Sequence, residues 1–381
     1  MTEEFLPFAR PCISEEAIAE VVACIRSGWI TTGPRVARFE QMLSEYHGGR
    51  HALALSSATA GLQLALLALD LKDGDEVITT ALTFVATLNT IMLAGGKPVL
   101  VDIDETLNID VSKIEAAITP RTRAIMPVHF TGLSVDLDAI YALAKKHKLR
   151  VVEDCAQAIG TEYKGKRLGS FGDIQVMSFH PNKNMTTGEG GAVITDDADV
   201  IKRIERLRFH GIDRDAFNRF AKTGSQEYDV VLPGYKYNMM DMQAALGIHQ
   251  LPALQGFIEA RTKLAERYLE LLKGWPGLDL PQLPTYANRH SWHLFTVRLT
   301  DAAGMTRDTF LAKMKEHNIG IGLHYQASHT FSFYRDTFGW QPNDFPKALR
   351  AGERICSLPL FPTLTEQEQV RVVKSMKQVL G

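Results

Sequence analysis

Residues 178–195 read SFHPNKNMTTGEGGAVIT, and the rest of the chain is organised around this stretch. It starts at the end of an apolar strand, breaks at Pro181, presents Lys183 in a polar loop and re-enters a strand at 192–195. A lysine held between two buried strands loses hydration, which disfavours its charged form and lowers its pKa. A neutral amine can condense with an aldehyde as a Schiff base. Because most lysines are simply exposed, the interpretation depends on which residues accompany Lys183.

The length and composition indicate a globular protein of two domains. A chain of 381 residues exceeds one ordinary core, and we expect a large domain over 1–255 and a smaller one over 256–381. The content of 45% hydrophobic and 23% charged residues is typical of a folded, soluble protein. The net charge of −2 provides no basic field, so neither nucleic acid nor an anionic membrane surface is an expected partner.

The cysteine pattern and the N-terminus indicate a cytoplasmic protein. The four cysteines are far apart and lack CxxC spacing, so we expect no zinc site, no other metal and no disulfide framework. Reduced thiols fit a cytoplasm. The sequence MTEEFLPFARP is acidic and lacks the apolar core of a signal peptide. No apolar run approaches the roughly 20 residues of a membrane span.

Alternating short apolar strands and helices fill residues 51–154, which predicts crossover units and a mainly parallel sheet covered on both faces. Ligands of such sheets bind beyond the carboxyl ends of the strands. Further along, we expect one helix from about Met239 and a second over 261–272 that leads to the smaller domain. A strand is predicted at 319–324.

Two polar segments fall at strand ends in this pattern. SSATAG at 56–61 lies between a strand and an apolar helix, where free N–H groups and small residues suit a phosphate. Taken alone, this segment is more typical of a capped helix without a ligand. Asp154 follows a strand that should be central, and a buried carboxylate there needs a cation or a donor. A protonated pyridine nitrogen would serve, and so would a helix cap or a surface ion pair.

Phe84 follows the strand at 77–80 and can stack on a flat ring, although aromatic residues at such positions more often belong to the core. Together with Lys183, these segments supply a phosphate cradle, an acid, a stacking face and an amine. The combination matches pyridoxal 5'-phosphate, whose chemistry needs a lysine Schiff base and a carboxylate on the pyridinium.

The chain resembles the DegT/DnrJ-type sugar aminotransferases along essentially its whole length. These are pyridoxal-phosphate enzymes of the aspartate-aminotransferase fold (fold type I), which has a large α/β/α domain and a smaller C-terminal α/β domain. The blocks that carry the resemblance are GWITTGP at 28–34, SSATAGLQLAL at 56–66, TFVATLN at 83–89, VVEDCAQAIG at 151–160, SFHPNKNMTTGEGGAV at 178–193 and GYKYNMMDMQAALG at 234–247.

The resemblance implies a role for individual residues. Lys183 would form the Schiff base and move the proton, and Asp154 would pair with the pyridine nitrogen. Phe84 would stack on the ring, and Gln157 would lie near its 3-hydroxyl. The phosphate would be bound by Thr59, Ala60 and Ser178. Substrate candidates are Trp29, Thr31, His324, Tyr325 and His329, which are also consistent with purely structural roles.

The resemblance further implies a two-fold homodimer with shared active sites. In many relatives the GYxYx segment reaches the phosphate of the neighbouring subunit with Asn at its third place and Arg at its fifth. Lys236 and Asn238 occupy these places here. Either one is therefore a candidate for the contact.

The implied reaction is a two-step transamination. Glutamate would leave as 2-oxoglutarate and convert the cofactor to pyridoxamine 5'-phosphate, whose amine would pass to the keto group of a nucleotide-linked sugar. EFLPFARP, SWHLF at 291–295, GLHYQASHTFSFYR at 322–335 and AGERICSLPLFP at 351–362 most resemble enzymes that form UDP-4-amino-4-deoxy-L-arabinose (UDP-L-Ara4N), used in lipid A modification. The acceptor expected is then a UDP-4-keto-pentose. HPNKN and EDCAQA depart from the HAIKN-like run and the histidine of those enzymes.

Other functions fit the same fold. A 4-keto-6-deoxyhexose or a 3-keto sugar, serving polysaccharide or antibiotic biosynthesis, stays open as the acceptor. Sugar dehydratases of this fold replace the lysine by histidine, whereas Lys183 is present here. A non-catalytic regulatory protein that binds the cofactor is a further alternative, against which the retention of the catalytic positions argues.

Overall fold

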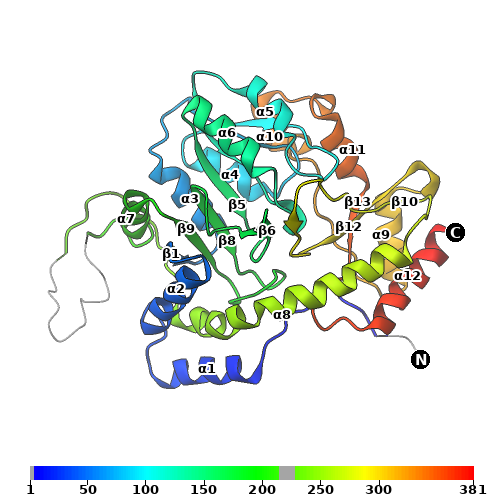
Figure 1. Cartoon of the computed structure of the whole chain (residues 1–381), viewed down its shortest axis with the longest axis horizontal. Coiled ribbons are helices and arrows are strands. Elements are labelled where there is room, and N and C mark those ends of the chain that lie inside the picture. The colour runs from blue at the N-terminus through cyan, green and yellow to red at the C-terminus, as the bar shows by residue number, and fades with distance from the viewer. Residues whose placement is uncertain (1–3, 214–227) are drawn as a thin grey trace.

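The computed structural model describes residues 4–213 and 228–381. Figure 1 shows a central sheet with helices on both sides and a C-terminal layer beside it, joined by one long helix, α8. In the large sheet the strands are β1 (His51–Leu55), β2 (Glu76–Thr80), β3 (Lys97–Val101), β4 (Thr122–Met126), β5 (Arg150–Cys155), β8 (Ile174–Ser178) and β9 (Gly191–Thr195). The helices before α8 are α1 (Glu15–Arg26), α2 (Pro34–Tyr46), α3 (Ala58–Ala68), α4 (Val85–Leu93), α5 (Val111–Ala117), α6 (Leu137–His147) and α7 (Ala198–Leu207).

The large sheet has the order β1-β9-β8-β5-β4-β2-β3. All of its pairings from β8 to β3 are parallel, and only β9 runs antiparallel to its neighbours. This confirms the prediction of a mainly parallel α/β sheet. Burial explains the pattern, because β2, β8 and β9 are buried at every residue, as strands covered on both faces must be.

The C-terminal part has its own sheet and core. A three-stranded sheet is formed by β10 (Leu278–Asp279), β12 (Phe295–Leu299) and β13 (Ile355–Leu358), in the order β10-β12-β13. A second small sheet joins β11 (Asn288–Arg289) to the hairpin of β6 (Glu162–Tyr163) and β7 (Lys166–Arg167). The remaining helices are α9 (Arg307–Glu316), α10 (Ser332–Phe338), α11 (Pro346–Arg354) and α12 (Glu366–Leu380).

The prediction of two helices around residue 255 was wrong. Instead, α8 runs unbroken over Asp241–Leu271 and contains Pro252. An interior proline costs about 3 kcal/mol, but Leu254 packs in the core of the large sheet and Tyr268 in the C-terminal core. Burial at both ends offsets the lost hydrogen bond. The predicted division after residue 255 thus falls inside one helix, and it stays a prediction.

The strand predicted at 319–324 is also absent. Ile319 makes a single bridge to Leu6, and Gly322 makes another to Ser357. Two glycines weaken strand pairing, and the N-terminal segment lies too close to this stretch for side chains, since a Cβ at Gly320 would lie 3.0 Å from Phe8 N. Residues 319–324 therefore make one isolated bridge to each of two neighbouring segments and do not pair as a strand.

Candidate active site

A cavity of about 450 Å³ opens where β2, β5 and β8 end. This is the carboxyl edge of the parallel strands, as the alternating pattern predicted. The predicted site residues that line it are Thr59, Phe84, Asp154, Gln157, Ser178, Lys183, His324 and Tyr325. The carboxyl edge of the large sheet and the segment 323–325 of the C-terminal part thus meet at one concave site.

Lys183 lies in the connection between β8 and β9, which pair as an antiparallel hairpin. Its backbone N–H donates to His180 O at 2.9 Å, which closes a turn and directs the side chain to the cavity. Burial lowers the pKa of Lys183 to about 8, although the charge of Asp154 opposes the change. An appreciable fraction of the amine is therefore neutral, and so nucleophilic, near neutral pH.

Asp154 reaches the cavity from the end of β5. Its Oδ1 accepts a hydrogen bond from the Ala156 N–H at 3.1 Å, and its Oδ2 accepts one from Thr87 Oγ1 at 2.9 Å. Burial nevertheless raises the pKa of Asp154, because these donors and Lys183 only partly offset the loss of water. A cation placed against the carboxylate would stabilise its charged form.

The N-terminus of α3 borders the same cavity. Ser57 caps the helix and accepts a hydrogen bond from the Ala60 N–H at 3.0 Å, so the amide of Ala60 is already engaged and Ala60 does not line the cavity. Ala58 and Thr59 do line it. A Cβ at Gly191 would lie 2.5 Å from Ala58 N, so glycine is needed for β9 to lie this close to the helix start. First-turn amides and a hydroxyl form a site for an anion.

Gln157 and Tyr325 connect the large sheet to the C-terminal part. The Gln157 side chain accepts from the Thr131 N–H at 2.7 Å and donates to Tyr325 Oη at 2.9 Å, so its amide orientation is fixed. The Phe84 ring lies 5.6 Å from that of Tyr325 and is 53% exposed. An apolar ring with an open face at a cavity wall can cover a planar ligand.

Two histidines complete the side of the cavity nearest the C-terminal part. His324 lines it, and its Nδ1 lies 3.0 Å from Ser357 Oγ. Burial, aided by the charge of Lys183, lowers the pKa of His324 to about 4. His293 lies behind Lys183, with its Nε2 3.4 Å from Lys183 Nζ. His293 was not among the predicted site residues, although it lies within the SWHLF block at 291–295, which was the available signal.

The other predicted residues do not line this cavity. Trp29 and Thr31 belong to the loop before α2, where the Thr31 carbonyl accepts from Asp241 N–H at 3.1 Å. His329 is buried and its Nε2 lies 2.9 Å from the Pro342 carbonyl, which fits a structural role. Lys236 Nζ donates to Asn238 Oδ1 at 2.7 Å. Neither Lys236 nor Asn238 contributes to the walls of the cavity in its own chain.

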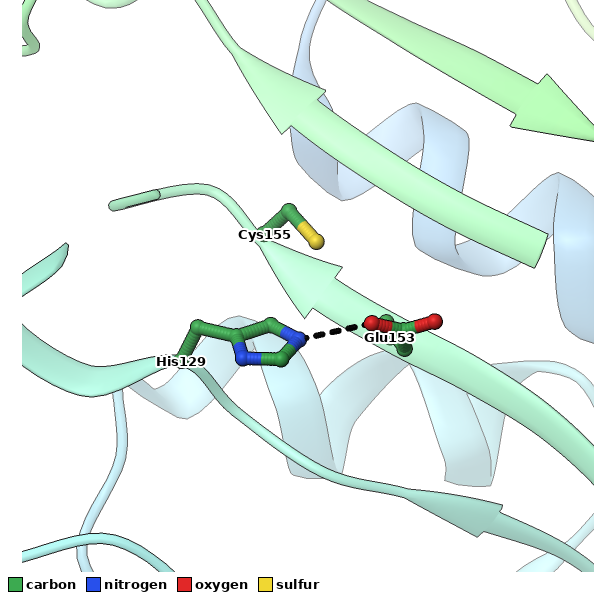
Figure 2. Close-up of side chains that lie close together, drawn as sticks. All are labelled: His129, Glu153 and Cys155. Atoms are coloured by element: carbon green, nitrogen blue, oxygen red, sulfur yellow. Dashed lines mark hydrogen bonds and ion pairs between the residues drawn. The ribbon is translucent and has the colours of Figure 1, made fainter. Parts of the chain in front are cut away.

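A cluster of possible metal ligands lies one layer deeper, at His129, Glu153 and Cys155 (Figure 2). His129 Nε2 lies 2.9 Å from Glu153 Oε2. The other Glu153 oxygen accepts from Tyr141 Oη at 2.6 Å and from the Gln175 side chain. Both carboxylate oxygens are thus hydrogen-bonded, which fits a polar network that fixes β5 next to Asp154.

The cavity matches pyridoxal 5'-phosphate group by group. The Lys183 amine suits its aldehyde, the Asp154 carboxylate its ring nitrogen, and the start of α3 its phosphate, while Phe84 offers a face to the ring. When bound, this cofactor supplies an electron sink for reactions at the carbon next to an amine. With a largely parallel sheet and a lysine hairpin, these features define a fold type I pyridoxal-phosphate enzyme.

Comparison with known proteins narrows this class. The model of the DegT/DnrJ/EryC1/StrS aminotransferase family matches residues 11–377, and the chain belongs to this family. It is a sugar aminotransferase with pyridoxal 5'-phosphate as its cofactor.

Full-length relatives are named for different biosynthetic roles. The chain is 44% identical to the UDP-4-amino-4-deoxy-L-arabinose–oxoglutarate aminotransferase of Shewanella sediminis, with all of both chains covered. It is also 44% identical to the spore coat polysaccharide biosynthesis protein SpsC of Bacillus subtilis, over 99% of this chain and 97% of that one. A putative sugar aminotransferase of Streptococcus pneumoniae, solved in its pyridoxamine-phosphate form, superposes with a TM-score of 0.91 at 34% identity, covering 98% and 99% of the two chains.

Proposed function

We propose that the protein transfers the amino group of glutamate to the 4-keto group of a nucleotide-linked sugar, with a UDP-4-keto-pentose as acceptor and UDP-L-Ara4N as product. The observation that carries the aminotransfer is the placement of Lys183 and Asp154 on one cavity. The choice of sugar is supported by the full-length similarity to the Shewanella enzyme. The product would be used in lipid A modification, and the protein would act in the cytoplasm.

The residues of the cavity have distinct tasks in this proposal. Lys183, whose pKa is about 8 in the cofactor-free protein, would accept and return the transferred proton as a free amine. Asp154 would hold the ring nitrogen of the cofactor, and Gln157, whose amide is oriented by Tyr325, would bind its ring hydroxyl. Thr59 and Ser178 bind the phosphate at the start of α3.

We further propose a homodimer whose sites are shared. Phe84 is 53% exposed, Leu323 41% and Met240 41%, and the first two line the cavity. Apolar side chains at a site entrance gain from a covering surface. Lys236 and Asn238 do not line the cavity of their own chain, which suits a role at the neighbouring subunit's phosphate.

A second acceptor class is supported by a specific finding. Identity to SpsC, a spore coat polysaccharide biosynthesis protein, equals that to the Shewanella enzyme, at 44%, so the full-length similarity extends to a protein named for a different product. An aminotransferase for a 4-keto-6-deoxyhexose or a 3-keto sugar is therefore the alternative. The dehydratase alternative lacks support, because Lys183 occupies the place that histidine takes in those enzymes.

Spectroscopy in two stages tests the proposal. Glutamate is first mixed with the cofactor-loaded protein, and the visible band of the bound aldehyde should fall as pyridoxamine phosphate forms. A band that does not change would leave a cofactor-binding protein without turnover. UDP-4-keto-pentose and dTDP-4-keto-6-deoxyhexose are then compared as acceptors by recovery of the band. Faster recovery with the hexose would contradict the pentose assignment while retaining the aminotransferase.

A further inference from the structure

His293 is the buried neighbour of the Lys183 amine. Its side chain lies just before β12, is 2% exposed, and places Nε2 3.4 Å from Lys183 Nζ. Its other nitrogen, Nδ1, has no hydrogen-bond partner among the described residues. A buried imidazole with one nitrogen on the reactive amine and the other unpaired is costly for stability alone, so its position calls for a functional explanation.

Two further contacts fix this histidine relative to the lysine loop. The Asn184 side chain, next to Lys183, donates to the Ser291 carbonyl at 2.7 Å and so joins the two segments. From α8, Arg261 Nη1 donates to the carbonyls of His293 at 3.2 Å and Leu360 at 2.8 Å. The backbone that carries the His293 ring is thus tied to α8 and to the lysine loop.

The surroundings of His293 keep its ring neutral. Burial lowers its pKa well below the usual value, and the positive charges of Lys183 and Arg261 act in the same direction. A neutral imidazole has one nitrogen that donates and one that accepts. Nε2, which faces the amine, can therefore accept a hydrogen bond while the ring stays neutral.

We propose that His293 is a positioning residue that accepts a hydrogen bond on Nε2 from the Lys183 ε-amino group whenever this amine is free, and so holds it over the cavity. The inference rests on the proposed function, in which Lys183 alternates between a covalent bond and a free amine. His293 would set where the amine waits; it would not itself exchange a proton with the substrate.

Three variants of His293 separate this role from packing. A glutamine places its amide near the Nε2 position, an asparagine places it near Nδ1, and a phenylalanine fills the volume without an acceptor. In each full-length protein, stripped of cofactor, the pH dependence of Lys183 reductive methylation is followed by peptide mass spectrometry. This reports the pKa of the amine independently of turnover.

The sign of the change decides the outcome. Losing an acceptor for the charged amine disfavours that form, so His293→Phe and His293→Asn should move the midpoint about one pH unit below the wild-type value of about 8. The neutral, reactive fraction of the amine at pH 7 then rises about fivefold. His293→Gln should restore the wild-type midpoint. An unchanged midpoint in His293→Asn, or a rise toward that of a free lysine through entry of water, would overturn the proposal. If His293→Phe fails to fold, the Asn and Gln pair gives the same contrast.

The loaded enzyme provides a second readout. His293→Asn should lower kcat about tenfold with the KM for glutamate unchanged, and His293→Gln should recover most of it. A fall confined to KM would contradict the positioning role. The His293 variants could show the predicted shift in the midpoint of Lys183 methylation while the wild-type protein does not respond to glutamate. That result would refute the proposed function and leave the positioning role of His293 intact, so the two failures are distinguishable.

Discussion

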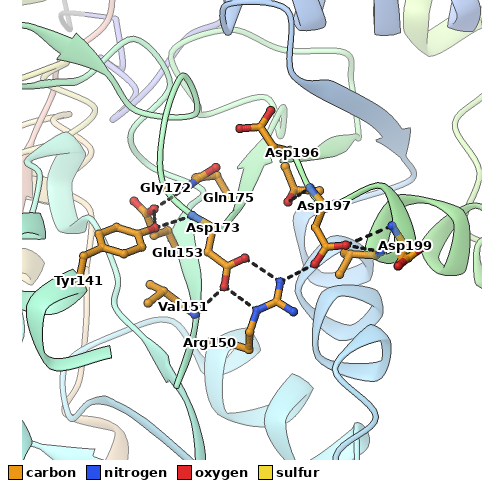
Figure 3. A network of polar contacts seen from close by, with 12 residues as sticks. Tyr141, Arg150, Val151, Glu153, Gly172, Asp173, Gln175, Asp196, Asp197 and Asp199 are labelled. Carbon is orange, nitrogen blue, oxygen red and sulfur yellow. Dashed lines mark hydrogen bonds and ion pairs between the residues drawn. The ribbon is translucent and has the colours of Figure 1, made fainter. Parts of the chain in front are cut away.

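The two ends of β5 use charge in opposite ways. At its first residue, Arg150 donates to both oxygens of Asp173, at 2.8 and 2.7 Å, and to Asp197 at 3.0 Å (Figure 3). These partners raise the pKa of Arg150 and favour its charge. Near its other end, burial raises the pKa of Asp154 and lowers that of Lys183, so both charges are disfavoured.

This contrast within one strand distinguishes a structural network from a binding site. Charges that are paired by several hydrogen bonds contribute to the stability of the fold. Charges held in a cavity with too few partners lower the stability of the folded protein. A ligand that supplies the missing partner restores this stability. The carboxyl end of β5 is therefore prepared for a ligand, and the amino end is complete.

The largest expected effect comes from Lys183→Ala. Activity with glutamate should fall by at least about 10³-fold, because the covalent attachment and the transferable proton are both lost. Formation of 2-oxoglutarate from glutamate measures the rate, because this readout does not depend on a lysine-bound aldehyde. Lys145→Ala, at an exposed position of α6, is the matched control and should react as the wild type does.

Substituting the two aspartates tests the contrast directly. Asp154→Asn should lower kcat/KM about 100-fold without loss of stability, because a neutral amide replaces a carboxylate whose charge is disfavoured. Asp173→Asn should lower the free energy of unfolding by about 1–3 kcal/mol and leave kcat/KM nearly unchanged. Steady-state kinetics and urea denaturation of both variants provide the comparison. The reverse pattern would show that the ends of β5 had been assigned wrongly.

Two tyrosines, Tyr325 in the cavity wall and the buried Tyr268, sharpen the comparison further. Tyr325→Phe removes the hydrogen bond to Gln157 and should lower kcat several-fold, about what 1 kcal/mol is worth. Tyr268→Phe removes a hydrogen bond of 3.1 Å to the Pro359 carbonyl in the C-terminal core and should lower only stability. Kinetic assays and thermal melts of both variants distinguish them. If Tyr325→Phe has the same kcat as the wild type, the hydrogen bond that orients Gln157 does not contribute to turnover.

A pH dependence of stability is also expected. The Lys183 amine titrates near pH 8 in the folded, cofactor-free protein and near pH 10.4 when unfolded. Between these values the unfolded chain binds more protons, so the free energy of unfolding rises with pH. Lys183→Met removes this contribution. Urea denaturation at pH 8 and pH 10 should show a smaller rise in the variant, and an equal rise would mean that the amine is not desolvated.

Much of the site could be predicted because it is local in sequence. Lys183 is delimited by two apolar strands, and Asp154 ends a third, so a strand pattern alone places both at the carboxyl edge of the sheet. The serine cap at the start of α3 is likewise encoded by neighbouring residues. Periodicity and capping were sufficient for these elements.

What sequence reasoning missed depends on packing between distant segments. His293 reaches Lys183 from 110 residues away, and no local pattern encodes that distance. The continuity of α8 depends on two cores that outweigh Pro252. The engagement of the Ala60 amide by Ser57 follows from cap geometry that the phosphate prediction did not include.

Among the described residues, no helix has the length and apolar character to cross a membrane.

Reduction of the cofactor-loaded protein with borohydride, followed by peptide mapping, tests the central claim most directly. The reagent fixes the cofactor to whichever lysine holds its aldehyde. We predict a pyridoxyl label on the peptide that contains Lys183, with none on the same peptide of Lys183→Ala. A label on another lysine, or a protein that retains no label, would contradict the assignment of this cavity.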